Sequence, residues 1–135
     1  MVKSLVIYAD GRARPNPGPA AIGIVIQGQD GEVVKEISQR IGKATSNQAE
    51  YRALILGLEE AGKLGAVHLD IRLDSELLVR QIRGQYRVKN AELKPLFQRV
   101  NQLFSKFRSV QIEHIPREQN RVADALARRG WEGED

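Results

Sequence analysis

The sequence predicts a single α/β domain in which helices pack on both faces of a mixed β-sheet. The chain has 135 residues, enough for one ordinary domain with its own hydrophobic core. Apolar residues recur with the two-residue period of strands in some segments and with the helical period in others. These segments follow the order βββαβααβα, in which helices separate the later strands. Such an order favours parallel strands beside an antiparallel start.

The N-terminal part of the chain predicts three strands. Residues 5–10 form an apolar, β-branched run that stops at Asp10, where the glycine- and proline-rich loop GRARPNPGP follows. Residues 20–29 and 32–41 then flank the pair Asp30-Gly31, which is typical of a β-hairpin turn. We therefore expect Asp10 to lie at the end of the first strand.

A helix and a fourth strand come next. The helix is expected over roughly residues 47–64, with Thr45 and Asn47 as alternative N-caps. Its apolar stripe comprises Leu54, Leu58, Ala61 and Leu64. Residues 67–74 alternate between apolar and polar side chains, so they predict a strand that ends at Asp74.

The C-terminal half predicts two helices, a strand and a final helix. Ser75 is placed to cap a short helix that ends before Gly84, and a second helix is expected near residues 92–107, with Pro95 in its first turn. Residues 110–114 alternate as a fifth strand.

The last helix is expected to begin at Asn120, whose side chain is a suitable N-cap. Residues 1–130 should form the domain. The segment WEGED, residues 131–135, is expected to be a flexible tail.

Composition excludes several kinds of site. The chain has no cysteine, which excludes disulfides, zinc–thiolate sites and thiol nucleophiles. No apolar run reaches the roughly 18 residues of a membrane helix, and residues 5–7 are too short for the core of a signal peptide. Lysine and arginine outnumber aspartate and glutamate by 21 to 17, so the surface should attract a polyanion. We expect a soluble, cytoplasmic monomer without membrane contact.

Four acidic residues occupy the ends of predicted elements. Asp10 and Asp74 end strands, whereas Glu50 and Asp124 lie near the starts of helices. The carboxyl ends of neighbouring strands and the starts of the following helices face one crevice in such sheets, so the four acids could meet there. A cluster of carboxylates is stabilised by a hard divalent cation such as Mg²⁺ or Mn²⁺. Taken singly, each acid has a simpler alternative role as a helix cap or turn residue.

Four segments around these acids resemble the motifs of ribonuclease H type 1. They are YADGRARPNPGPAAIG, TSNQAEYRALILGLEEA, LDSELLVRQIRGQYRVKN and HIPREQNRVADALA, and together they span residues 8–127. The resemblance implies a five-stranded mixed sheet in the order 3-2-1-4-5 with helices on both faces. It is to a short form of the family, without the basic protrusion and without the hybrid-binding domain.

The resemblance also implies an activity. Members of the family hydrolyse the RNA strand of RNA–DNA hybrids with two divalent ions, roughly 3.5 to 4 Å apart, and leave 5′-phosphate and 3′-hydroxyl ends. Their metal-binding and catalytic acids correspond here to Asp10, Glu50, Asp74 and Asp124. Double-stranded RNA is a further expected partner because it shares the A-form minor groove. The alternatives are an idle domain that binds hybrids or double-stranded RNA, and a resolvase-like nuclease that cuts DNA.

Other residues match positions that touch substrate in the family. Asn16 and Asn47 correspond to contacts near the RNA minor groove, and Thr45 to a contact with a DNA phosphate. Asn90 matches a DNA-side contact, although it is equally suited to cap a helix. The complete set of expected substrate-binding residues is Gly11, Asn16, Thr45, Asn47, Ser75, Glu76, Arg80, Arg83, Arg87, Lys89 and Asn90.

The sequence departs from the family in three places. Only residues 85–89 stand where many bacterial members carry a basic helix, so hybrid affinity should depend on the four basic residues Arg80, Arg83, Arg87 and Lys89. His114 is expected to belong to the fifth strand, which leaves Arg117 as the better candidate to touch the scissile phosphate or the leaving group. Glu76 replaces a glutamine that is common in the family and adds negative charge near the substrate.

Overall fold

The structure is a computed structural model that describes residues 3–132. Its centre is a five-stranded sheet in the order β3-β2-β1-β4-β5. The first three strands are antiparallel neighbours, whereas β4 and β5 run parallel to β1. The strands are β1 (Ser4–Ala13), β2 (Gly18–Gly28), β3 (Val33–Ala44), β4 (His68–Leu73) and β5 (Ser109–His114). The expected mixed sheet and its strand order are confirmed.

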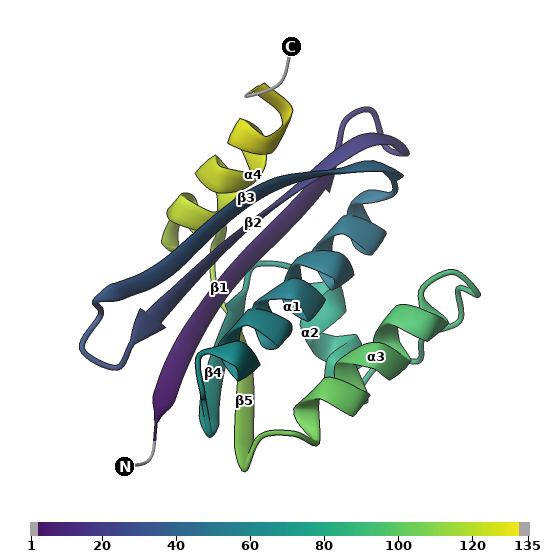
Figure 1. The fold of residues 1–135 in the computed structure, drawn as a ribbon. Helices are drawn as coiled ribbons and strands as arrows, with labels where there is room; N and C mark the ends of the chain where they lie inside the picture. The colour runs from purple at the N-terminus through teal and green to yellow at the C-terminus, as the bar shows by residue number, and fades with distance from the viewer. Residues whose placement is uncertain (1–2, 133–135) are drawn as a thin grey trace.

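Helices cover both faces of this sheet (Figure 1). α1 (Ser46–Lys63), α2 (Glu76–Ile82) and α3 (Lys94–Phe104) lie on one face, and α4 (Arg121–Glu132) packs on the other, against β2 and β3. A 3-10 turn over Arg117–Gln119 precedes α4. Each helix within residues 3–132 is too short or too polar to cross a lipid bilayer.

The main core lies between α1 and the sheet. Leu54, Leu58 and Ala61, three members of the predicted apolar stripe, have no exposed surface. A β-carbon on Gly57 of the same helix would come within 3.1 Å of Ile7 Cγ2, so the helix contacts β1 closely. This contact sets the distance between α1 and β1.

Thr45 fixes the start of α1 and decides between the two predicted N-caps. Thr45 Oγ1 accepts a hydrogen bond of 3.0 Å from the backbone N–H of Gln48, and the Gln48 side chain accepts one of 2.8 Å from the backbone N–H of Thr45. This reciprocal pair is a capping box. Asn47, the other candidate, is exposed in the first turn. Glu50 therefore lies one turn into the helix.

The short helix α2 begins and ends as predicted. Ser75 Oγ accepts a hydrogen bond of 3.2 Å from the backbone N–H of Leu78, and Gly84 adopts a φ of +79° just after the helix. The buried Tyr51 hydroxyl of α1 donates to Gln81 Oε1 of α2 at 2.8 Å. That bond holds the two helices together near their sheet-facing sides.

α4 packs directly on the sheet because glycines line the contact. A β-carbon on Gly23 of β2 would lie 2.2 Å from Ala123 O, and one on Gly130 would lie 2.7 Å from Ala21 Cβ. The helix backbone therefore contacts the strand backbone at Gly23, and at Gly130 it contacts the small Ala21 side chain and the backbone of Gln39. These contacts therefore fix the distance between the start of α4 and the strands β1 and β2.

β1 continues past Asp10, so the prediction that this strand ends there was wrong. Its parallel pairing with β4 stops at Ala9, but its antiparallel pairing with β2 continues to Ala13. The last three residues stay extended because β2 supplies their hydrogen-bond partners, although Gly11 resembles the start of a loop by sequence. Asp10 thus lies inside β1, at the point where pairing with the neighbouring strand β4 has stopped and pairing with β2 continues.

The helix predicted near residues 92–107 is shorter than expected at both ends. The Asn90 side chain accepts hydrogen bonds from the backbone N–H groups of Glu92 (2.7 Å) and Leu93 (3.2 Å), which creates a turn before α3. Pro95 lies in the first turn of α3, as predicted.

The flexible tail expected at residues 131–135 stays a prediction, and its first two residues are the last residues of α4. Trp131 Nε1 donates a hydrogen bond of 3.0 Å to Pro19 O, and the Arg14 guanidinium lies 5.3 Å from the centre of the Trp131 ring. These contacts join the end of α4 to the start of β2 and to the loop that precedes it. The remaining three residues of the tail lie outside the described residues.

Candidate active site

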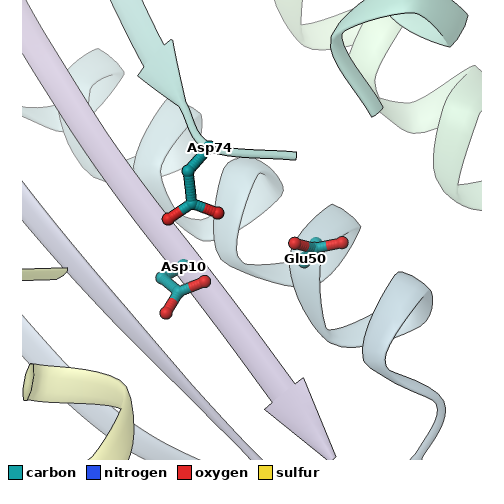
Figure 2. A group of neighbouring side chains, drawn as sticks. All are labelled: Asp10, Glu50 and Asp74. Atoms are coloured by element: carbon teal, nitrogen blue, oxygen red, sulfur yellow. The ribbon is translucent and has the colours of Figure 1, made fainter. Parts of the chain in front are cut away.

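Three acidic side chains converge where the pairing between β1 and β4 stops (Figure 2). Asp10 comes from β1, Glu50 from α1, and Asp74 directly follows β4. One carboxylate oxygen of each lies within 4.8 Å of the corresponding oxygen of the other two. Asp10 is buried, with 4% of its surface exposed, and the other two are half-buried. This arrangement brings together three of the four acids predicted from the sequence.

Strand pairing explains why Asp10 and Asp74 meet. Ala9 and Leu73 are the last residues paired between the parallel strands β1 and β4, so the residues that follow them emerge side by side. Glu50 reaches the same place because Gly11 has no side chain. A β-carbon on Gly11 would lie only 2.4 Å from the carbonyl carbon of Ala49, so α1 contacts the β1 backbone there.

Burial and mutual repulsion make two of these acids hard to ionise. Burial, followed by the charge of Asp74, raises the pKa of Asp10 to about 8. The same two causes raise the pKa of Glu50 to about 7, although a hydrogen bond from Ser75 and the charges of Arg12 and Arg117 oppose the shift. Without a counter-charge, the cluster would hold protons near neutral pH.

The donor set fits a hard divalent cation. Three carboxylates are the ligands that Mg²⁺ and Mn²⁺ prefer. The buried Asp10 Oδ2 has no hydrogen-bond partner among the described residues, which leaves it available to a cation. Metal binding would also relieve the repulsion that raises the pKa values of Asp10 and Glu50.

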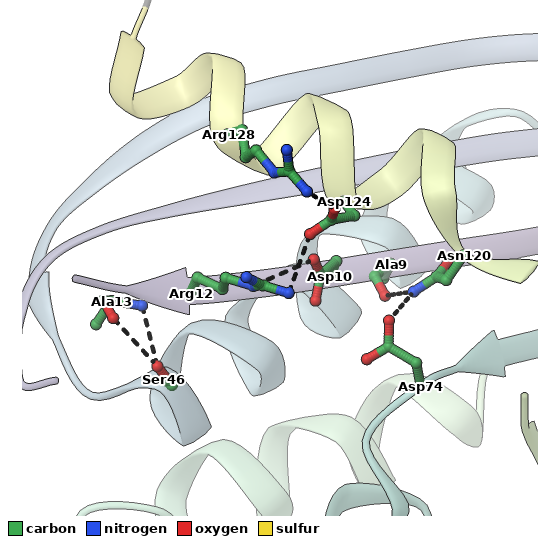
Figure 3. Close-up of polar contacts among 9 residues, drawn as sticks. All are labelled: Ala9, Asp10, Arg12, Ala13, Ser46, Asp74, Asn120, Asp124 and Arg128. Carbon is green, nitrogen blue, oxygen red and sulfur yellow. Dashed lines mark hydrogen bonds and ion pairs between the residues drawn. The ribbon is translucent and has the colours of Figure 1, made fainter. Parts of the chain in front are cut away.

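The fourth predicted acid, Asp124, lies next to this group but is paired with arginines (Figure 3). Its Oδ1 is 3.1 Å from Arg12 Nη2, and its Oδ2 accepts a hydrogen bond of 2.7 Å from Arg128 Nη2. Burial pushes the pKa of Asp124 upward, but the neighbouring Asp10 side chain and the charges of Arg12 and Arg128 bring it below its ordinary value. Arg12 and Arg128 therefore stabilise the ionised form of Asp124.

Asn120 has a role that the sequence analysis missed. It was predicted to cap α4 with its side chain. Instead, its buried Nδ2 donates to Ala9 O at 3.0 Å and to Asp74 Oδ2 at 2.9 Å, while its backbone carbonyl accepts from the N–H of Asp124. Asn120 thus orients Asp74 against β1. The only signal in the sequence was its position four residues before Asp124, where a helix cap is also expected.

Four predicted substrate-binding residues line one hollow beside the acids. They are Asn16, Thr45, Asn47 and Asn90, which come from three separate segments. Asn16 Oδ1 accepts a hydrogen bond of 3.0 Å from the backbone N–H of Ser46, which directs this side chain to the start of α1. A row of polar side chains therefore extends away from the acidic cluster.

The predicted basic residues divide into two groups. Arg80 Nε donates to Glu76 at 2.8 Å and its guanidinium lies over the Tyr86 ring, while Arg83 donates to a backbone carbonyl of β5. Arg87 and Lys89 are exposed and make no ion pair within residues 3–132. The second pair is the more available to a polyanion.

His114 and Arg117 flank the site from the β5 side. His114 is the last residue of β5, as expected, and is exposed beside Arg80 and Arg83 of α2. Arg117 begins the 3-10 turn, and its charge acts on the pKa of Glu50. Arg117 is thus close enough to the acids to affect their charge.

The raised pKa values predict how pH changes the stability of the metal-free protein. Between about pH 4 and pH 8 the folded protein binds more protons than the unfolded chain, because only the folded state raises the pKa of Asp10 and Glu50. The free energy of unfolding should therefore fall as pH rises through this window. In EDTA, we expect Asp10→Asn to have a higher Tm than the unmodified protein, and we expect this difference in Tm to increase with pH. A Tm difference that is constant from about pH 5 to pH 8 would contradict this.

Known proteins resemble the whole chain. A family model described as reverse transcriptase-like matches residues 8–130. Ribonuclease HI of Halobacterium salinarum is 43% identical over 120 residues, which are 89% of this chain and 60% of that protein. The bifunctional protein Rv2228c of Mycobacterium tuberculosis is 46% identical over 124 residues, which are 91% of this chain and 34% of that protein. The chain thus spans between a third and three fifths of the length of these relatives.

Solved structures agree in fold. The crystal structure of RNase H1 from Halobacterium salinarum has a TM-score of 0.95 and 40% identity, covering 97% of this chain and 99% of that one. LC11-RNase H1 in complex with an RNA/DNA hybrid has a TM-score of 0.91 and 40% identity, covering 96% and 97%. The match of the family model over residues 8–130 places the chain, with its mixed sheet and acidic cluster, in the reverse transcriptase-like class. Within that class, the chain belongs to the ribonuclease H type 1 family.

Proposed function

We propose that this domain is an endoribonuclease that hydrolyses the RNA strand of RNA–DNA hybrids and leaves 5′-phosphate and 3′-hydroxyl ends. The observation that carries the proposal is the convergence of Asp10, Glu50 and Asp74 within 4.8 Å, just beyond the last paired residues of β1 and β4. The similarity to LC11-RNase H1, which was solved with an RNA/DNA hybrid, supports the substrate class.

Divalent ions, Mg²⁺ or Mn²⁺, are the proposed cofactor, with two ions per site when substrate is bound. Asp10, Glu50 and Asp74 would hold them, with Asp124 as a fourth ligand. Such ions supply Lewis-acid stabilisation of the charge that develops on the attacking and leaving oxygens. The donor set and the unpartnered Asp10 Oδ2 support this assignment.

The protein itself orients these groups. Asn120 holds Asp74 through its 2.9 Å hydrogen bond, and Ser75 stabilises the ionised form of Glu50. Arg117 is the proposed contact for the scissile phosphate, because a guanidinium can donate two parallel hydrogen bonds to it. Its electrostatic effect on Glu50 supports that position.

Recognition of RNA is assigned to the polar row beside the acids. Amides such as those of Asn16 and Asn47 can bond the 2′-hydroxyl groups that distinguish RNA from DNA. Thr45 and Asn90, which share their hollow, are proposed to contact the DNA strand. The predicted substrate contact at Gly11 would have to be made by its backbone, because the backbone of α1 fills the space beside its α-carbon.

The test compares three labelled duplexes. RNA–DNA hybrid, RNA duplex and DNA duplex are incubated with the protein in Mg²⁺, Mn²⁺ or EDTA, and the product ends are mapped. We expect cleavage of the hybrid in either metal, none in EDTA, and 5′-phosphate ends. Binding of the hybrid without cleavage would favour the idle binding domain, and cleavage of DNA duplex would favour a resolvase-like nuclease. Cleavage of RNA duplex, a monomeric state and a cytoplasmic location stay predictions.

Salt should weaken hybrid binding because the protein neutralises phosphates. Each phosphate contact made by a basic residue contributes about 0.7 to 0.9 to the slope of log affinity against log salt concentration. We expect Arg87→Gln and Lys89→Gln each to lower that slope by about this amount. Arg80→Gln should change it less, because Arg80 is already paired with Glu76. Equal slopes for all three variants, measured by fluorescence anisotropy in EDTA, would contradict the division of basic residues described above.

A further inference from the structure

We propose that Arg12 is a resident counter-cation on the Asp124 side of the acidic cluster, and that a divalent ion binds this side only when the Arg12 guanidinium moves away. This inference rests on the proposed function, since it assumes that Asp10 and Asp124 are metal ligands. Arg12 was not among the site residues predicted from the sequence.

The position of Arg12 follows from the extension of β1. Residues two apart on a strand point to the same face, so Arg12 projects beside Asp10 and toward α4. Its Nη2 lies 3.1 Å from Asp124 Oδ1, and its Nε lies 4.0 Å from Asp10 Oδ2 (Figure 3). Only 19% of the Arg12 side chain is exposed. One guanidinium therefore lies between two carboxylates that come from different elements.

These contacts are those of a cation lying near two carboxyl groups rather than of an aligned hydrogen-bonding fork. Asp10 Oδ2, Asp124 Oδ1 and Arg12 Nη2 are all buried, and none has a hydrogen-bond partner among the described residues, despite the 3.1 Å approach. The two oxygens thus lie near a positive charge without an aligned hydrogen bond to it. A small ion with two charges would satisfy them better, but it would repel the guanidinium.

Arg128 also contacts Asp124 and can be compared with Arg12. It contacts the other oxygen of Asp124 through an aligned hydrogen bond of 2.7 Å from one turn further along α4. Its side chain is 55% exposed, and among the ion pairs of residues 3–132 it contacts only this one acid. Arg128 therefore carries the same charge on the same carboxylate without lying between two acids.

The consequence concerns the number of ions that the substrate-free protein binds. Among Asp10, Glu50 and Asp74, only Asp10 forms an ion pair with an arginine within residues 3–132, and that pair is long, at 4.0 Å, so one ion should bind to these three acids readily. A second ion, between Asp10 and Asp124, must compete with Arg12. Free protein should then bind one ion well and a second ion poorly.

The test is a titration of substrate-free protein with Mn²⁺, followed by calorimetry and by the electron paramagnetic resonance signal of unbound Mn²⁺. The proteins are the unmodified chain, Arg12→Gln, Arg12→Lys and Arg128→Gln. We expect Arg12→Gln to tighten the second site by about fivefold or more, at the lower end of ordinary couplings between sites. Arg12→Lys and Arg128→Gln should resemble the unmodified chain, and Asp124→Asn combined with Arg12→Gln should abolish the gain.

Superimposable isotherms for the unmodified chain and Arg12→Gln would overturn the inference, as would an equal gain in Arg128→Gln. Failure of the unmodified chain to bind Mn²⁺ at all would instead overturn the proposed metal site. Tm values in EDTA and in excess Mn²⁺ show that each variant is folded. Arg12→Ser, which removes the charge and the bulk, repeats the measurement if the glutamine variant does not fold.

Discussion

Asp10→Asn is expected to reduce cleavage of RNA–DNA hybrid by about 10³-fold or more, an effect of the size seen when a central charged group is removed from an active site. Asp10 is the most buried member of the acidic cluster and lies near both Asp74 and Asp124. Asparagine keeps the shape but supplies one neutral oxygen in place of a charged carboxylate. The charge that attracts divalent ions is therefore lost without a change in packing.

Two measurements separate this loss from unfolding or loss of substrate binding. Single-turnover cleavage gives the rate, and anisotropy in EDTA, where neither protein should cleave, gives hybrid affinity, which we expect to stay within about threefold because Asp10 is buried. Asp70→Asn is the matched control, since Asp70 lies on the neighbouring strand and pairs with Arg72 outside the cluster. Cleavage by Asp10→Asn at a rate near that of Asp70→Asn would contradict the proposed mechanism.

Gly11→Ala is expected to produce the second largest effect, through the position of α1. The added β-carbon would lie 2.4 Å from the carbonyl carbon of Ala49 and 2.7 Å from the backbone nitrogen of Glu50, and neither can move unless the helix moves. We expect a cost of about 1 to 3 kcal/mol in the free energy of unfolding, typical of an overpacked contact. Cleavage should fall by about 10²-fold, since a shift near 1 Å of a catalytic group has that consequence.

Gly62→Ala is the control for this substitution. Gly62 lies on the same helix, but a β-carbon there would meet only Phe107, at an ordinary 3.8 Å. Alanine also stabilises a helix by about 1 kcal/mol relative to glycine. This variant should therefore be at least as stable as the unmodified chain and equally active. Denaturant unfolding and single-turnover cleavage test both variants. A Gly11→Ala protein with full activity would show that Glu50 does not depend on the close contact between α1 and β1.

Hydrophobic periodicity and caps predict the elements of this fold well, because local sequence determines both. The apolar stripe of α1, the Ser75 cap and the Asp30-Gly31 turn all follow from residues close together in the chain. The last part of β1 does not. Gly11 to Ala13 have little preference for strand, and they are extended because β2, a separate segment, pairs with them.

The acidic cluster could be predicted from positions at the ends of elements, but its supporting contacts could not. An asparagine before a helix is ordinarily a cap, so nothing local indicates that Asn120 bonds Asp74, which lies 46 residues away in the chain. In the same way, an arginine in a loop-like sequence suggests a solvated charge. The structure instead places Arg12 between two acids because the strand continues.

The hydrogen bond from Asn120 to Asp74 affects the point during synthesis at which the chain can become catalytically active. Three carboxylates are already present once β4 has emerged, yet the amide that orients Asp74 comes from a segment close to the end of the described chain. A growing polypeptide that lacks α4 would carry loosely oriented acids. We expect nascent or truncated chains to be inert toward nucleic acid hydrolysis, so that competence arises only when the C-terminal helix docks.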